Sequence, residues 1–188
     1  SSGDKIEFYY HSGGYVWNIV TTQVFRDPSA WYHIVIAFDS TQVTNTNRIK
    51  IFVNGTQVTE FDTAAYPAQD VSGVLLDSTA LQIGAKNGAS FFDGYLAEVH
   101  VLDGTAVTDA SDFGEAGDYG EWKPKEVSGL TYGTNGFYLD FADAADLGDD
   151  ESGEGNDFAE TNITASDQML DSPTNNFCTL NPLNNDSS

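Results

Sequence analysis

The sequence predicts an all-β protein, built as an antiparallel β-sandwich. Of its 188 residues, 40% are hydrophobic, which is enough apolar material for one packed core. Twelve Phe and nine Tyr, with 18 Gly and a single Met, favour strands and turns over helices. Short apolar segments recur through the first hundred positions with turn residues between them, and this spacing is typical of a sandwich or barrel.

The segments expected to form strands lie mostly in the first hundred residues. The second of them should place Tyr15, Trp17 and Ile19 on one face, because side chains alternate along a strand. The third is apolar at both parities, so we expect it to be central and covered on both faces. The expected strands are residues 6–10, 15–25, 31–39, 81–85, 94–102 and 136–141, with a hairpin over 48–58.

The hairpin has the clearest local signal in the chain. Alternating apolar residues lead into Asn54-Gly55, and a type I′ turn needs positive φ at both central positions, which Asn and Gly tolerate best. Residues 60–80 should then form a long loop around Pro67, and residues 108–113 one helical turn.

The charge is strongly negative and unevenly distributed. The formal net charge is −22, and 19 of the 29 acidic residues lie after position 100 with only two of the seven basic ones. Such a surface repels phosphate backbones and anionic lipid heads, so we expect no nucleic-acid partner. No apolar run reaches the roughly 18–20 residues that a membrane span needs, so no membrane insertion is expected. Cys178, a lone cysteine, gives neither an internal disulfide nor a metal framework.

The same imbalance suggests a division of the chain. Residues 1–141 should form the sandwich, whereas residues 142–188 are polar and acidic with scattered apolar anchors. We expect the second part to be an extended acidic C-terminal arm, or a linker to a following domain, that packs against a neighbouring protomer because its anchors are too few to order it alone.

Four segments follow one another in the first hundred residues: Trp31-Tyr32-His33-Ile34, Ile51-Phe52-Val53-Asn54-Gly55, Leu81-Gln82-Ile83-Gly84 and the segment from Phe92 to Val101. In type and order they resemble the concanavalin A-like (laminin-G-like) jelly roll, over roughly residues 6–115. A full jelly roll has more strands than this sequence shows, so the resemblance implies that some N-terminal strands come from missing sequence or a neighbouring chain.

Two later segments, residues 137–158 and 169–182, are similar to sequences that follow such domains in bacteriophage structural proteins. The resemblance implies a non-catalytic structural and recognition module of a virion, such as a fibre, tail or head-decoration protein. Its place would be extracellular or on the virion surface, its partners other virion proteins and further copies of itself, and its exposed face would bind host surface glycans. The alternative is a soluble carbohydrate-binding domain or a degenerate glucanase.

An enzyme is not expected, and no catalytic residue is assigned. Related glucanases place Glu, Asp and Glu at alternate positions of one strand, and the matching positions here are Glu98, His100 and Leu102. Asp103 lies five residues from Glu98 and so on the other face, which leaves no facing carboxyl pair for glycoside hydrolysis. His33 should be a hydrogen-bonded sheet residue and His100 should face solvent, since no two histidines have a zinc-type spacing.

No cofactor is required on this interpretation, and calcium is the one ion that the sequence favours. Hard oxygen ligands gather in a Gly-punctuated loop, although their spacing differs from that of the helix-loop-helix calcium site. The alternative is a solvated acidic turn. The four candidate ligands are Asp149, Asp150, Asn156 and Asp157.

Exposed aromatic side chains are the candidates for glycan binding, because an aromatic ring can stack on the apolar face of a sugar. The alternative is that these side chains form core or interface contacts. The four candidates are Tyr9, Tyr15, Trp17 and Tyr95.

Overall fold

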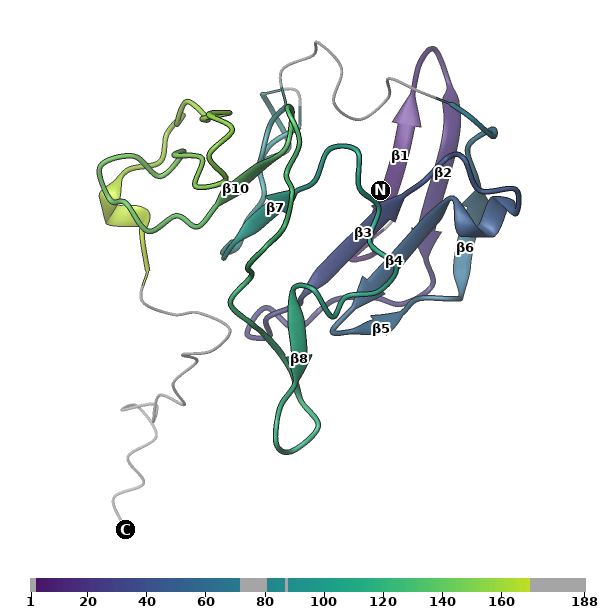
Figure 1. Ribbon diagram of the computed structural model, residues 1–188, viewed down its shortest axis with the longest axis horizontal. Helices are drawn as coiled ribbons and strands as arrows, with labels where there is room; N and C mark the ends of the chain where they lie inside the picture. Colours follow the sequence, from purple (N-terminus) through teal and green to yellow (C-terminus); the bar gives the residue numbers. More distant parts are fainter. Residues whose placement is uncertain (1–2, 72–80, 87, 170–188) are drawn as a thin grey trace.

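The structure is a computed structural model that describes residues 3–71, 81–86 and 88–169, and it is nearly all β (Figure 1). Two short 3₁₀ helices interrupt the strands, η1 (Asn45–Asn47) and η2 (Ala165–Asp167). The strands are β1 (Glu7–His11), β2 (Tyr15–Thr21), β3 (Ile34–Phe38), β4 (Ile49–Val53), β5 (Thr56–Gln57), β6 (Phe61–Ala65), β7 (Val99–Val101), β8 (Gly114–Ala116), β9 (Trp122–Pro124) and β10 (Phe137–Leu139). Within these ranges, no helix is both long and apolar enough to cross a membrane.

Two antiparallel three-stranded sheets, β1-β2-β6 and β3-β4-β5, form the sandwich. Trp17 and Ile19 of β2 pack against Ile49, Ile51 and Val53 of β4, and all five side chains are buried. The expected antiparallel β-sandwich is therefore confirmed. Two further antiparallel pairs, β10-β7 and β8-β9, lie beside it (Figure 1).

A second, smaller core lies on the other face of the β3-β4-β5 sheet. Val35 and Phe52 pack there with Ala110, and Trp122 is among the side chains that cover them. The strand covered on both faces is therefore β4, and the prediction of a central, doubly covered 31–39 strand was wrong. Strand β3 lies at the edge of its sheet among the described strands, and Ile36 is 37% exposed there. The prediction failed because apolar residues at both parities do not reveal the order in which strands pair.

The hairpin turn is confirmed, with φ of 47° at Asn54 and 75° at Gly55. Several other boundaries differ from the prediction. The expected loop 60–80 contains β6, whose residues pair with β2, and β8 and β9 occupy a stretch expected to be irregular. Residues 81–85 form no strand, and residues 108–113 end in a tight turn instead of a helical one. Strand β7 begins only at Val99, because Glu98 has a positive φ of 55°, outside the β region.

Residues 142–169 return to β10 instead of extending away from it, as Figure 1 shows. The backbone N–H of Glu151 donates to the Tyr138 carbonyl at 2.9 Å, and the ring of Phe158 lies 4.8 Å from that of Phe137. This part of the expected extended arm is thus folded locally within a single chain. Residues 170–188, including Cys178, lie outside the described residues, and the division at 141/142 stays a prediction.

Candidate functional site

The outer face of the β1-β2-β6 sheet carries polar side chains, whereas its inner face builds the core. Strand register aligns Glu7 with Val20 and Thr63 across the sheet, and Tyr9 with Asn18. Because side chains alternate along each strand, these residues share the face opposite the core.

A hollow of about 510 Å³ opens on this face. Its volume falls in the range of about 300–1,000 Å³ that is common for small-ligand sites, but the hollow is shallow and largely open to solvent. Its lining is mostly polar and includes both signs of charge. The lining residues are Lys5, Glu7, Tyr15, Asn18, Val20, Asp62, Thr63 and Lys86.

The ring of Tyr15 forms one border of the hollow. Tyr15 is 61% exposed, and its ring meets those of Tyr9 and His11 edge-on, at centroid distances of 5.4 and 5.5 Å. A register shift between Tyr10 and His11 interrupts the alternation, so Tyr15 does not share the face of Trp17 as the parity predicted. The Tyr15 hydroxyl reaches Glu7 Oε1 at 3.5 Å, which holds its ring over the open face.

Charged and polar groups supply the rest of the hollow. Lys5 is paired with Asp62, and Lys86 Nζ lies 4.7 Å from the centre of the Tyr9 ring and donates to the Tyr9 hydroxyl. The Oδ1 atom of Asn18 is buried and has no hydrogen-bond partner within the described part of the chain. An exposed aromatic ring beside several donors and acceptors can bind a sugar, through its apolar face and its hydroxyls together.

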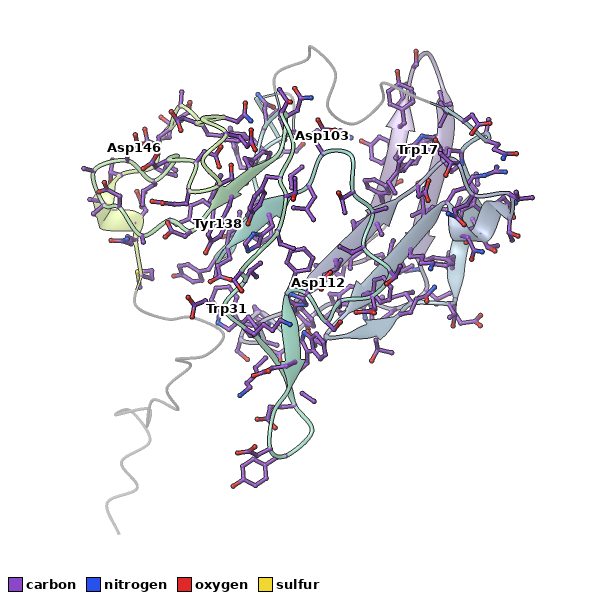
Figure 2. The ribbon with its side chains drawn as sticks, viewed as in Figure 1. Trp17, Trp31, Asp103, Asp112, Tyr138 and Asp146 are labelled. Carbon is purple, nitrogen blue, oxygen red and sulfur yellow. The ribbon has the colours of Figure 1, made fainter. Side chains whose placement is uncertain are left out.

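Of the four predicted glycan-stacking residues, Tyr15 lines the hollow, whereas Tyr9 contacts Tyr15 and Lys86 but does not line it. Trp17 does not line it either, and the prediction that it is exposed was wrong: it is 1% exposed and packs against Phe8 at 4.8 Å between the ring centroids. Figure 2 shows Trp17 among the strands of the sandwich. Tyr95 is 60% exposed but does not line the hollow.

The polar lining of the hollow could not be predicted, because no motif or spacing along the sequence links its residues. Lys86 follows β6 by more than twenty positions, and only the folded chain brings it to Tyr9 of β1. The alternation of β1, which places Glu7 and Tyr9 on one face, is the sequence signal that pointed to this surface.

The predicted calcium ligands instead organise a loop. Asp150 is 8% exposed, and its carboxylate accepts hydrogen bonds from the backbone N–H groups of Tyr138, Ser152 and Asn156 and from the Ser152 hydroxyl. Burial works to raise the pKa of Asp150, but these hydrogen bonds outweigh it and hold the pKa below its ordinary value.

The other candidate ligands are engaged in the same way or point elsewhere. The Asn156 side chain donates to the carbonyls of Thr134 and Gly136, and Asp157 accepts from the Asp150 N–H. Asp149 is exposed. In the stretches that the structure describes, no three acidic, His or Cys side chains are grouped closely enough to hold a metal ion, and the calcium site stays a prediction.

A second cluster surrounds His100, whose side chain is only 9% exposed, so the expectation that it faces solvent was wrong. Its ring stacks on Tyr138 at 4.1 Å, and its Nδ1 lies 2.8 Å from the Tyr132 hydroxyl. Its Nε2 is buried without a hydrogen-bond partner in the described residues, 4.0 Å from Glu98 Oε2. Burial, together with the nearby His33, lowers the pKa of His100 to about 4. Figure 2 shows Tyr138 on the small β10-β7 sheet.

Glu98 in this cluster has an acidic neighbour from another strand. Leu139 of β10 pairs with Val99 of β7, so Asp140 and Glu98 are the residues that come next to this pair, just outside the two strands. Burial, and then the charge of Asp140, raise the pKa of Glu98. The spacing of acids along a single strand cannot reveal this neighbour, because Asp140 directly follows β10 and lies about forty positions away in the sequence.

The two packed antiparallel sheets define the class of β-sandwich proteins. A family model described as the concanavalin A-like lectin/glucanases superfamily matches residues 1–111, and the chain belongs to this superfamily. No curated protein and no solved structure matches the chain.

Proposed function

We propose that this chain is a non-catalytic carbohydrate-recognition module that binds a glycan in the hollow of the β1-β2-β6 sheet. The observation that carries the proposal is the combination of the exposed Tyr15 ring with Asn18, Thr63 and Lys86 around one opening. The ring would cover the apolar face of a sugar, and the polar groups would exchange hydrogen bonds with its hydroxyls.

Screening against immobilised oligosaccharides, followed by calorimetry, tests this proposal. Tyr15→Ala should weaken binding by about tenfold, because it removes the stacking ring from an exposed position that the fold does not need. Tyr119→Ala is the matched control, since Tyr119 is 97% exposed and does not line the hollow. The proposal fails if no oligosaccharide binds, or if both variants bind as tightly as the wild type.

The biological setting that we propose is the surface of a virus particle, as part of a fibre, tail or head-decoration protein. The similarity of residues 137–158 to segments of bacteriophage structural proteins supports this setting. Further copies of the chain and other virion proteins would then be its partners, with a host cell-surface glycan as the recognised ligand.

The second candidate is a degenerate glucanase, and Glu98 is the observation that favours it. A carboxyl whose pKa is raised by burial and by a second carboxyl, here Asp140, has one property of a glycosidase general acid. Hydrolysis of β-glucans that Glu98→Gln abolishes would establish this activity. If the β-glucans stay intact after long incubation, this second candidate fails.

A further inference from the structure

We propose that the glycan bound in the hollow carries a carboxylate, as uronic and sialic acids do, and that Lys86 binds this carboxylate. The inference rests on the proposed function and adds the chemical class of the ligand. It starts from the placement of a cation on a chain that has only seven basic residues against 29 acidic ones.

The ammonium group of Lys86 has no acidic partner within ion-pair distance among the residues described here. Its contact is with a phenol: Nζ lies beyond the Tyr9 hydroxyl, to which it donates a hydrogen bond. An ammonium group has three N–H donors, so this contact leaves donors that face the hollow. Lys5, the other lysine of the hollow, is already paired with Asp62.

The contact with Tyr9 also favours the charged form of Lys86. The hydrogen bond to the Tyr9 hydroxyl is the largest influence on the pKa of Lys86, and it raises that pKa above its ordinary value. Lys86 is exposed and charged at neutral pH in any case, so a ligand carboxylate would form a charge-assisted hydrogen bond with it, which is stronger than one to a neutral sugar hydroxyl.

The acidic residues of the hollow limit how much negative charge the ligand can carry. Glu7 lies on the Tyr15 side, and its charge acts on Lys86 as well. A second anionic group on the ligand would face Glu7 or Asp62 and be repelled. The hollow is therefore suited to a sugar with a single carboxylate and not to a densely sulfated polymer.

Asn18 completes the site on the polar side. Its Oδ1 atom makes no hydrogen bond within the described part of the chain, and an unpaired buried acceptor costs free energy. That oxygen is shielded from the hollow, so the ligand would meet the rest of the Asn18 side chain, which lines the hollow, and would place its carboxylate near Lys86.

Calorimetry with two matched pairs of sugars tests the inference: sialyllactose against lactose, and cellobiouronic acid against cellobiose. The acidic member of at least one pair should bind about tenfold more tightly, and this preference should shrink as salt is added. Lys86→Gln should remove the preference, so that the acidic and the neutral member of each pair bind with equal affinity. Lys123→Gln is the control, because Lys123 is also exposed but lies on the β8-β9 hairpin beside Glu115.

Two outcomes would overturn the inference separately from the proposed function. If the neutral sugars bind as tightly as the acidic ones, and Tyr15→Ala weakens both, the glycan site stands and the carboxylate assignment fails. If Lys86→Gln keeps the acidic preference, another group binds the carboxylate and the assignment also fails. If no sugar of either kind binds, both proposals fall.

Discussion

His100 couples two parts of the chain through a single ring. Alternation along residues 94–102 sets it opposite the apolar Val99 and Val101, which predicts exposure. Pairing of β10 with β7 instead brings Tyr138 onto the ring, and Tyr132, 32 positions away, reaches Nδ1. No local pattern contains these partners, so the burial of His100 could not be predicted from the sequence.

Acid should destabilise the protein through His100. Its pKa is about 4 in the folded chain against an ordinary 6.5, so the folded state keeps the ring neutral while the unfolded state takes up a proton. The stabilisation is complete above about pH 6.5 and is lost as the pH falls toward 4. Urea unfolding at about pH 7 and about pH 5 should show a loss of about 1–2 kcal/mol that His100→Phe abolishes.

The other groups around His100 set the controls for this measurement. Glu98 acts in the opposite direction, because burial and Asp140 raise its pKa and protonation therefore favours the folded state. Burial also lowers the pKa of His33, which therefore acts in the same direction as His100, and the phenols of Tyr132 and Tyr138 lie against the His100 ring. His11→Phe removes an exposed histidine and should leave the acid sensitivity intact. An unchanged pH dependence in His100→Phe would show that another group is responsible.

At the scale of elements, local patterns predicted β1, β2 and the β4-β5 hairpin, which are confirmed. The hairpin turn could be predicted because its two positive φ angles need particular residues, Asn54 and Gly55. Strand β9 could not be predicted, because it has only three residues and its position depends on the contact of the Trp122 ring with Gly55 of the hairpin turn. There the Trp122 indole N–H donates to His33 Nδ1 at 3.0 Å, joining segments 89 positions apart.

Gly55 should be more sensitive to substitution than its turn alone requires. A Cβ at this position would overlap the Trp122 ring, in addition to the strain of an L residue at a φ of 75°. Gly120 has a similar φ of 85° with no atom near its Cβ position, so it isolates the strain. We expect Gly120→Ala to cost about 1 kcal/mol and Gly55→Ala about 2–4 kcal/mol in urea unfolding. Equal costs would contradict the packing of Trp122 on the turn.

For the whole molecule, the sequence predicted the fold class, and the order of strands came only from the structure. Apolar parity shows that a segment is buried but not which neighbour covers it, so the prediction placed β3 at the centre of the sheet, where the structure has β4. The candidate site follows the same rule. Tyr9 and Tyr15 could be named in advance, but Lys86 and Asn18 acquire their role only when the β1-β2-β6 sheet and the chain after it come together.

The open edge at β3 is where we expect copies of the chain to associate. Ile34 and Ile36 are 46% and 37% exposed there, and an edge strand offers unpaired backbone groups to another strand. A net charge of −22 opposes this contact, so association should strengthen as added salt screens the repulsion.

Light scattering of the eluted protein at low and at moderate salt tests this expectation. The wild type should form a multimer at moderate salt, and Ile36→Lys should shift it to the monomer, because a charge on the edge strand prevents strand pairing. Val43→Lys adds the same charge at a position that is 83% exposed in a loop, and it should assemble like the wild type. A wild-type monomer at every salt concentration would remove self-association from the proposed setting, because a glycan-binding module of a virion would then need other proteins to hold it in place.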